Sequence, residues 1–386
     1  MTGILTLNTG SSSLKFGLYH DAEDPEMLVH GQVDGIGASA KLVLQTGEDR
    51  TSRSVNADTP SKALEHVIIA LAPHIEGMCI SGVGHRIVHG GPDYSEPLVL
   101  RQDALEDLDR LTPLAPLHQP HNLAGVAAAQ SIFPNAVQVG CFDTAFHRGH
   151  PWVNDTFALP RALYDEGVRR YGFHGLSYDY VTSVVEQDYP DLHAGRLVIA
   201  HLGNGASMCA VQHGKSVGST MGFSALDGLP MGTRCGQIDP GAVLFLIEQR
   251  GMAPHDVMQM LYKNSGLLGL SGQSSDMREL LASDRPEAAQ AIDYYVTRAR
   301  REVGALSAIM GGIDGLIFCG GIGENAAPIR QRIVNGLSFL GIEVDEAANA
   351  RNASDIGTGP TRVMIIPTDE ERMIARATHD ALSALR

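Results

Sequence analysis

The sequence is poor in the features that mark secreted, zinc-binding and membrane proteins. Only 5 of its 386 residues are cysteines, and they stand apart from one another without the spacing of a disulfide framework or a zinc site. No apolar run approaches the ~20 residues of a membrane-spanning helix. The N-terminus lacks the basic stretch and apolar core of a secretory signal. These absences predict a soluble, reduced, cytoplasmic protein that contacts no membrane.

Positive charge is also scarce. The chain has 29 Lys and Arg residues against 44 Asp and Glu residues, which gives a net charge of -15. A nucleic acid needs a basic surface on its partner, so we expect no nucleic-acid binding. A few cationic side chains that converge in one cleft can still bind a small anion.

Two familiar kinds of site are missing from the sequence. No Gly-x-x-x-x-Gly-Lys-Ser/Thr segment occurs, which excludes the P-loop mechanism. His85 and His89 lie four apart on an expected strand, so their side chains share a face only loosely. His118 and His121 bracket Gln119-Pro120, which we expect to be non-helical, and no Glu follows the first His as in zinc proteases. We therefore expect no zinc site.

Glycine is abundant, with 43 residues, and it concentrates in two distant turns. One turn lies in Asn8–Lys15, after the strand-like Ile4–Leu7, and the other in His201–Ser207, after Leu197–Ala200. Glycine lets the backbone approach a ligand closely, and successive N–H groups of a turn form an anion-binding concavity. One such turn alone is typical of an ordinary hairpin. The pair predicts a duplicated cradle for nucleotide phosphates.

Strand-like and helix-like segments alternate along the chain, and their order recurs after a shift in composition near residues 149–151. This alternation predicts an α/β fold of two related domains with a cleft between them, residues 1–148 with 373–386 and residues 149–372. The expected segments are helices at 61–75, 122–132, 240–250 and 287–310, and strands at 79–88, 136–142, 197–202, 207–212, 315–319 and 362–366.

A third glycine-rich segment, Gly321–Ala326, fits Gly-x-Gly-x-x-Ala, follows an expected strand and opens a helix. That context suits nucleotide phosphates at a helix N-terminus, and it also suits the dinucleotide fingerprint of a NAD-dependent oxidoreductase. The segment lies late in the chain, with only one further strand, which counts against the oxidoreductase. A catalytically inactive nucleotide sensor is a third interpretation.

Two arginines favour phosphoryl transfer. Arg86 enters a glycine turn from a strand-like run, and Arg234 lies in a glycine-flanked loop. An arginine in a strand more often extends into solvent at a sheet edge. Two arginines from opposite halves could instead meet across a cleft, where the guanidinium fork matches carboxylate and phosphoryl oxygens.

Acidic and histidine candidates complete the predicted site. Asp143 and Glu370 follow apolar runs, where open α/β sheets place their sites, although Asp143 would also suit a helix N-cap. His174 lies among glycines and aromatic residues and is a candidate phosphoryl donor, although a lone histidine more often has a structural role. Hard cations prefer oxygen ligands, so we expect Mg²⁺, with Mn²⁺ as an alternative, at Glu370 and Asn8.

Together these segments resemble the acetate kinases and their short-chain acyl-kinase relatives over nearly the whole chain. The resemblance rests on ordered motifs: Asn8–Lys15, Gly84–Gly91, Pro116–His118, Phe142–His147, Arg170–Gly175, His201–Gly205, Met231–Arg234, Gly320–Asn325 and Thr368–Glu371.

The resemblance implies two duplicated ribonuclease-H-like domains, the fold shared with sugar kinases, actin and chaperone ATPases. It also implies a homodimer and a reversible, magnesium-dependent, direct in-line transfer of phosphate between ATP and acetate, giving ADP and acetyl phosphate. Asp143, His174 and Arg234 would be catalytic, the last two by stabilising the transition state. Asn8 and Glu370 would bind the metal, with Glu371 as an adjacent alternative.

The resemblance further assigns binding residues by position. Arg86 would hold the substrate carboxylate, in a substrate site with Val88, Leu117, His118, Phe173 and Ala225. The nucleotide would be bound by Lys15, His201, Leu202, Gly203, Asn204, Gly205, Asp276, Met277, Arg278, Gly321, Ile322, Gly323, Glu324 and Asn325.

Two points follow from chemistry within that resemblance. A carboxylate substrate is already ionised at neutral pH, so we expect Asp143 to position the metal or a neighbouring group rather than to remove a proton. Many acetate kinases carry proline where this chain has Ala225, and that proline lines the pocket for the acetate methyl group. A roomier wall would admit propionate, so a propionate or butyrate kinase is the nearest alternative.

Overall fold

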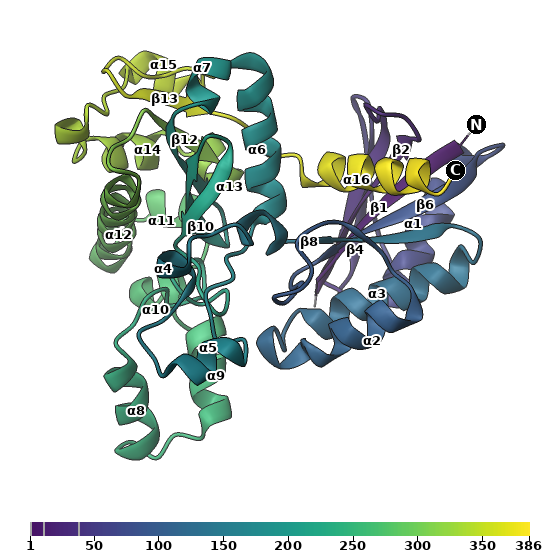
Figure 1. Ribbon diagram of the computed structural model, residues 1–386, viewed down its shortest axis with the longest axis horizontal. Helices are drawn as coiled ribbons and strands as arrows, with labels where there is room; N and C mark the ends of the chain where they lie inside the picture. The colour runs from purple at the N-terminus through teal and green to yellow at the C-terminus, as the bar shows by residue number, and fades with distance from the viewer. Residues whose placement is uncertain (1, 11, 38) are drawn as a thin grey trace. The chain divides into compact units, whose positions relative to one another are not determined.

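The computed structural model describes residues 2–10, 12–37 and 39–386, and the chain forms two compact units. Unit 1 comprises Met1–Arg148 and Asp369–Arg386, and unit 2 comprises Gly149–Thr368 (Figure 1). Our expected boundary at residue 373 stays a proposal; in the structure that residue lies within helix α16 (Glu370–Ala384).

Unit 1 is built on a mixed sheet. Over the described residues its strand order is β5-β4-β3-β2-β1-β6-β8-β7, in which β1, β6 and β8 are parallel and the other neighbours are antiparallel. The strands are β1 (Thr2–Thr9), β2 (Ser13–His20), β3 (Met27–Asp34), β4 (Lys41–Thr46), β5 (Asp49–Ser54), β6 (Cys79–Ile87), β7 (Leu98–Val99) and β8 (Val137–Phe142).

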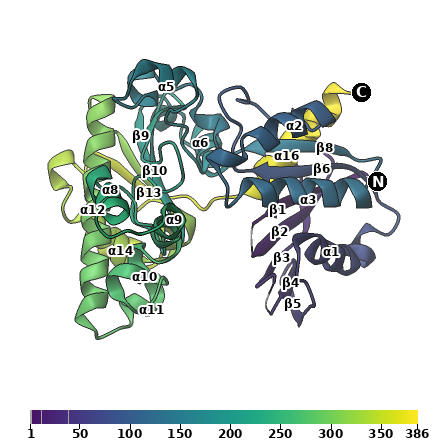
Figure 2. The same cartoon turned by 90° about the horizontal axis from the view of Figure 1, so that it is seen from below.

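Helices cover both faces of this sheet. Helices α1 (Pro60–Ile75) and α3 (Gln119–Ile132) lie on one face and α16 on the other, as two perpendicular views show (Figures 1 and 2). Thr59 caps α1 by accepting a hydrogen bond from the Lys62 N–H, and Pro60 suits the first turn. The remaining helices are α2 (Gln102–Arg110), η1 (Thr112–Leu114) and η2 (Ala145–His147).

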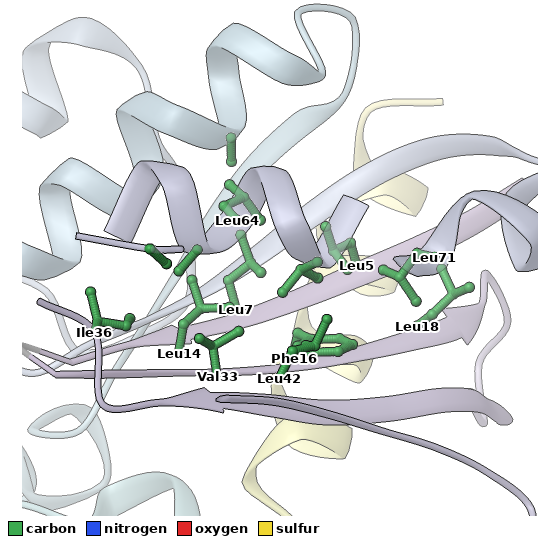
Figure 3. Packing of buried hydrophobic residues seen from close by; sticks show 14 of the residues in the cluster. Leu5, Leu7, Leu14, Phe16, Leu18, Val33, Ile36, Leu42, Leu64 and Leu71 are labelled. Carbon is green, nitrogen blue, oxygen red and sulfur yellow. The ribbon is translucent and has the colours of Figure 1, made fainter. Parts of the chain in front are cut away.

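The main core of unit 1 lies between α1 and the strands. Leu64, Val67 and Leu71 recur at helical spacing and are fully buried. They pack in one cluster with alternate residues of the strands (Figure 3), including Leu5, Leu7, Phe16, Leu18, Val33 and Leu42. The core therefore forms where the apolar face of the helix, whose residues recur every 3.6 positions, packs on the face of the sheet to which every second strand residue points.

Unit 2 repeats the strand order of unit 1. Its sheet runs β11-β10-β9-β12-β13 over the described residues, with β9, β12 and β13 parallel and β10 and β11 antiparallel, which matches β3-β2-β1-β6-β8 in order and direction. The predicted duplication of an α/β unit is thus confirmed. The strands are β9 (Arg196–Leu202), β10 (Ala206–Gln212), β11 (Lys215–Ser219), β12 (Gly315–Cys319) and β13 (Arg362–Ile365).

The sheet of unit 2 lies between α6 (Gly175–Asp188) and the 25-residue α12 (Pro286–Met310), on opposite faces (Figures 1 and 2). Over the described residues, no helix is long and apolar enough to cross a membrane. The other helices are α4 (Trp152–Asp155), α5 (Arg161–Asp165), α7 (Pro190–His193), α8 (Pro240–Glu248), α9 (Pro254–Lys263), α10 (Gly266–Ser271), α11 (Met277–Leu281), α13 (Gly320–Asn325), α14 (Ala327–Val334), η3 (Ser338–Leu340) and α15 (Glu346–Ala350).

Two local expectations were wrong. Gln119-Pro120 is helical, because Pro120 falls in the first turn of α3, where a missing N–H costs no hydrogen bond. The segment Gly320–Asn325 is itself a helix and not a turn before one. The two glycine hairpins are confirmed, because β1 pairs with β2 and β9 pairs with β10 across the expected turns.

The packing of α16 on β6 depends on glycine and gives a stability prediction. A Cβ atom on Gly84 would overlap Thr378 Oγ1 and Ile374 Cγ2 of α16, so only glycine allows this approach. We expect Gly84→Ala to lower the free energy of unfolding by about 1–3 kcal/mol in chemical denaturation. Gly304→Ala on α12 is the control: a Cβ there meets nothing within 4 Å, so it should raise stability by about 0.5–1 kcal/mol. Equal effects of the two changes would contradict this account.

Candidate functional site

The parallel strands of unit 1 bring three predicted site residues to one edge of the sheet. Leu7 of β1 pairs with His85 of β6, so the next residues along these strands, Asn8 and Arg86, are neighbours. Phe142 pairs with Ile87, which places Asp143 beside the same strand end. The carboxyl edge of parallel strands is where open α/β sheets place their sites.

Arg86 holds this group together. Its Nε donates to Asp143 Oδ1 at 2.9 Å, its Nη2 pairs with Asp143 Oδ2, and its Nη1 donates to Asn8 Oδ1 at 3.0 Å. Glu370 Oε2 at the start of α16 lies 3.8 Å from the Arg86 Nε. The Arg86 side chain is 20% exposed and that of Asp143 is 1% exposed. Arg86 therefore does not extend into solvent, and the Asp143 carboxylate binds an arginine instead of capping a helix.

The electrostatics of this cluster favour an added cation. Burial by itself lowers the pKa of Arg86, but the carboxylates of Asp143 and Glu370 outweigh it and raise that pKa above its usual range. Burial, the largest cause, and the nearby Glu370 together raise the pKa of Asp143 to about 6 against the opposing effect of Arg86. Burial and Glu370 also raise the pKa of Glu371. Three carboxylates around one guanidinium offer oxygen ligands that suit a hard cation.

The amide side chains of α3 fix the strand ends beside this cluster. Asn122 Oδ1 accepts from the Val88 N–H at 2.9 Å, and Asn122 Nδ2 donates to the Thr9 carbonyl at 2.6 Å. The ends of β1 and β6 are thereby tied to one side chain. Of the remaining substrate-site candidates, Val88 is buried and Leu117 and His118 are half-buried just before α3; Phe173 and Ala225 belong to unit 2.

Unit 2 contains a cavity of about 670 Å³ at the corresponding edge of its sheet. Cys319 pairs with His201 at the ends of the parallel strands β12 and β9, so the segments that follow both strands meet there. The lining residues come from the β9–β10 turn, from α11 and the two residues before it, from α13 and the residue after it, and from the start of α14: Gly203, Asn204, Ser275, Asp276, Met277, Arg278, Leu281, Gly321, Ile322, Asn325, Ala326 and Pro328.

Most of the predicted nucleotide residues line this cavity, and some do not. Leu202 lies in the core, and Glu324 accepts hydrogen bonds from the Gly320 and Thr368 N–H groups. His201, Gly205 and Gly323 adjoin the lining segments without lining the cavity, and Lys15 lies in unit 1 near Glu371. Sequence reasoning missed Ser275, Leu281, Ala326 and Pro328, which flank the predicted residues along the chain.

The entry into α13 requires glycine at one position. Gly320 has a φ of +74°, and a Cβ there would lie 2.8 Å from the Leu202 carbonyl oxygen. Across the cavity, Asp276 caps α11 by accepting from the Arg278 N–H at 2.8 Å. The Arg278 side chain, which pairs with the same carboxylate, is the main cause that lowers the pKa of Asp276 to about 2.

Arg330 of α14 contacts α13, one of the helices that line the cavity, and this role was not predicted. It is fully buried, its Nη1 donates to the Gly323 carbonyl at 2.8 Å, and Nε and Nη2 donate to Asn349 and Asn352. Burial lowers its pKa to about 10. These acceptors are all neutral. A single arginine in an amphipathic helix gives no sequence signal for such a role.

His174 and Arg234 converge on the β9–β10 turn. His174 precedes α6 with a φ of 59°, a left-handed conformation that non-glycine residues rarely adopt and that is enriched at functional sites. Its ring stacks on that of His201 with centroids 4.4 Å apart. A Cβ on Gly205 would lie 3.2 Å from His174 Nε2 and 3.4 Å from Arg234 Nη2, so both side chains reach the same point.

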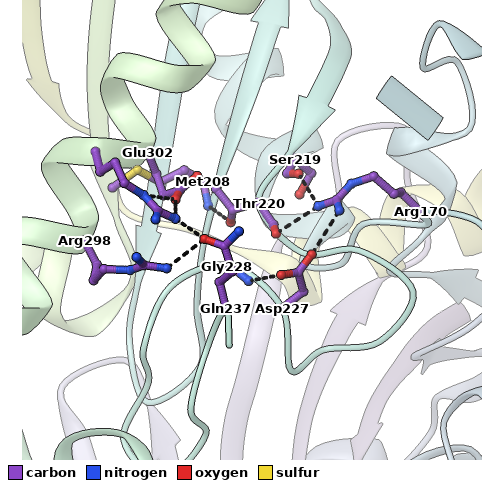
Figure 4. A network of polar contacts seen from close by, with 10 residues as sticks. Arg170, Met208, Ser219, Thr220, Asp227, Gly228, Gln237, Arg298 and Glu302 are labelled. Carbon is purple, nitrogen blue, oxygen red and sulfur yellow. Dashed lines mark hydrogen bonds and ion pairs between the residues drawn. The ribbon is translucent and has the colours of Figure 1, made fainter. Parts of the chain in front are cut away.

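Hydrogen bonds hold the segment that carries Ala225 and Arg234. Arg234 Nη1 donates to the Ala225 carbonyl at 3.0 Å. Figure 4 shows how Arg170 anchors this segment: its guanidinium pairs with Asp227 at 3.0 Å and donates to the carbonyls of Ser219 and Thr220. Ala225 and Arg234 therefore belong to one segment that hydrogen bonds and an ion pair hold in place.

Comparison with known proteins identifies the family. The family model described as the Acetokinase family matches residues 3–376. The chain belongs to this family. It is 49% identical to the acetate kinase of Methylocella silvestris over 97% of this chain and 96% of that protein, and 47% identical to the acetate kinase of Rhizobium meliloti over 100% and 99%.

Solved structures support the same family assignment. The acetate kinase of Porphyromonas gingivalis matches with a TM-score of 0.87 and 36% identity over 99% of this chain and 100% of that one. A propionate kinase of Francisella tularensis matches with a TM-score of 0.92 and 36% identity over 98% and 100%. This acetokinase family member is thus a phosphotransferase with a carboxyl acceptor, and the oxidoreductase and inactive-sensor alternatives are excluded.

The role of Arg330 gives a prediction for the stability of this protein. We expect Arg330→Met to lower the free energy of unfolding by at least about 2 kcal/mol, because buried acceptors left without donors cost about 1–3 kcal/mol each. Arg332→Met on the same helix removes an exposed pair with Asp293 and should cost less than about 1 kcal/mol. Urea denaturation of both variants makes the comparison, and similar losses would argue against a special role for Arg330.

Proposed function

We propose that the protein is an acetate kinase that transfers phosphate from ATP to acetate, reversibly and with Mg²⁺, by direct in-line transfer. The observation that carries the proposal is the buried Arg86 cluster at the strand ends of unit 1, in a chain about half identical to proteins named acetate kinase. ATP and ADP are the nucleotide substrates, and acetate and acetyl phosphate are the acyl substrates.

Arg86 is suited to hold the acetate carboxylate. A guanidinium has five N–H groups, and its contacts with Asp143 and Asn8 account for three of them. Beyond these contacts among the described residues, one N–H on each terminal nitrogen is available to carboxylate oxygens. Acetate is ionised at neutral pH and needs no general base. Asp143 therefore acts by positioning Arg86.

The metal ligands proposed for Mg²⁺, or alternatively Mn²⁺, are Glu370 and Asn8, with Glu371 as the adjacent alternative. Mg²⁺ usually keeps several waters and binds one or two carboxylates together with substrate phosphates, which suits this sparse set of oxygens. When bound, the ion would offset negative charge on the phosphates.

The cavity of unit 2 is proposed to bind the nucleotide. Its volume of about 670 Å³ lies within the range of ~300–1,000 Å³ usual for small-molecule sites. The backbone of Gly203–Gly205 and the start of α13 offer N–H groups to phosphate oxygens. His174 and Arg234 reach the same turn, where they would stabilise charge on the transferred phosphoryl group. Direct transfer requires that group to meet the acetate carboxylate.

A homodimer is also proposed. Helix α8 has the sequence PGAVLFLIE, yet none of its residues, all of which the structure describes, is buried. Leu244 and Phe245 on this helix are 54% and 52% exposed, and the preceding Ile238 is 39% exposed. An apolar surface of this kind commonly marks a protein–protein contact, and a second copy of the chain is the partner that we propose.

Propionate kinase activity is the second candidate, favoured by Ala225 and by the likeness to the Francisella tularensis propionate kinase. We expect hydroxamate formation from ATP, Mg²⁺, hydroxylamine and acetate, with a kcat/KM for acetate at or above that for propionate. One methylene changes discrimination by only ~1–3 kcal/mol, so propionate should also react. Butyrate and a reaction without carboxylate are the controls. A kcat/KM that is higher for propionate would assign the enzyme to propionate, and no hydroxamate from any acid would refute the proposal.

Arg234 provides the kinetic test of the transition-state role. We expect Arg234→Ala to lower kcat by about 10³-fold or more, by analogy with arginine fingers. Arg285→Ala, at an exposed arginine just before α12, is the control and should retain activity. Acetyl phosphate formation at saturating substrates measures both variants. A loss of less than tenfold in Arg234→Ala would mean that Arg234 has been misassigned.

A further inference from the structure

A chain of three polar side chains inside unit 2 ends at His174. His174 Nδ1 lies 2.8 Å from Ser207 Oγ of β10, and Ser207 Oγ lies 2.5 Å from the hydroxyl of Tyr178 on α6. Ser207 and Tyr178 are fully buried. The contacts lie at the ring nitrogen Nδ1, whereas Nε2 is the nitrogen that faces the Gly205 turn and Arg234.

The chemistry of the two hydroxyl groups gives this chain a direction. A phenol is a stronger hydrogen-bond donor and a weaker acceptor than an aliphatic alcohol, because its oxygen lone pair is delocalised into the ring. Burial, the largest cause, raises the pKa of Tyr178 well above its ordinary value, so the phenol keeps its proton. These properties favour Tyr178 as the donor to Ser207 Oγ. Ser207 has a single proton, which is then available to His174 Nδ1.

We propose that Ser207 and Tyr178 are positioning residues that hold His174 as the neutral tautomer with its proton on Nε2. In this form Nδ1 is the acceptor of the Ser207 hydroxyl, and Nε2–H is a donor directed at the site beside Gly205 and Arg234. The tautomer at a histidine is set by the hydrogen bond that its other nitrogen makes. This inference rests on the proposed function, in which that site receives the phosphoryl group.

The tautomer decides between the two roles that the sequence left open for His174. With a proton on Nε2, this nitrogen has no lone pair in the ring plane with which to attack phosphorus. His174 then forms no bond to the phosphoryl group, and it acts only as a hydrogen-bond donor to a phosphoryl oxygen. The opposite tautomer would present a bare Nε2, which is the form that a phosphohistidine intermediate requires.

The test is nitrogen NMR of the intact protein labelled with ¹⁵N-histidine, because it reads the tautomer without any turnover. The His174 signals are identified by their loss in His174→Asn. We expect the pattern of a protonated Nε2 and an unprotonated Nδ1. A protonated Nδ1, alone or together with Nε2, would overturn the proposal.

Variants test the two positioning residues. Ser207→Ala and Tyr178→Phe should each weaken the fixed tautomer pattern and lower kcat by about 10–100-fold, with a much smaller change in the KM for acetate, by analogy with the partners of metal-ligating histidines. Ser207→Thr keeps the hydroxyl and should restore the tautomer pattern. Tyr295→Phe is the matched control, because it removes another fully buried tyrosine hydroxyl, on α12, and should change neither readout. An unchanged tautomer in both Ser207→Ala and Tyr178→Phe would refute their role.

A labelling experiment separates this inference from the proposed function. After incubation with ATP labelled at the γ-phosphate, we expect no label bound to His174. Label at that residue would overturn the inference even if acetyl phosphate is formed. An Nε2–H tautomer in a protein that forms no acyl phosphate would refute the function and leave the positioning role standing.

Discussion

Parallel pairing of three strands is the constraint on which the candidate site of each unit depends. In unit 1 it sets Asn8, Arg86 and Asp143 side by side at the ends of β1, β6 and β8. In unit 2 the same order of strands sets the turn after β9 beside the start of α13 after β12. Side chains that are distant in sequence become neighbours because carboxyl ends of parallel strands meet at one edge. The duplicated fold therefore provides a candidate site at the same edge of the sheet in each unit.

The two units use buried charge in opposite ways. In unit 1 the carboxylates of Asp143, Glu370 and Glu371 outnumber the guanidinium of Arg86, so the region favours a further cation. In unit 2 the buried Arg330 is held by neutral oxygens alone, directly behind the segment that lines the cavity. A buried charge without a counterion is costly and adds to the positive potential around it. A metal ion suits the first arrangement and nucleotide phosphates suit the second.

The sequence could predict those parts of the site that follow strands. Both glycine hairpins, the α/β repeat and the residues at strand ends were found because an apolar run followed by glycine or charge leaves a local pattern. The prediction at Pro120 was wrong, since proline disrupts a helix interior but favours the first turn of a helix. Arg330, Ser207 and Tyr178 could not be found, because their roles depend on which buried atoms they meet across helices and strands. Tertiary contacts of this kind leave no periodic pattern in the sequence.

The chemistry of the acceptor explains why a donor histidine would be sufficient for the proposed reaction. A hydroxyl acceptor must lose a proton during phosphoryl transfer, so kinases that act on alcohols need a base near the acceptor oxygen. A carboxylate acceptor carries no such proton. What remains is to hold two anions together and to cover the charge on the transferred group, which requires donors and cations only. In the proposed function, Arg86 would hold the acetate carboxylate, and Arg234 and the Nε2–H of His174 would cover the charge. The hydrogen bonds from Ser207 and Tyr178 would keep that proton on Nε2.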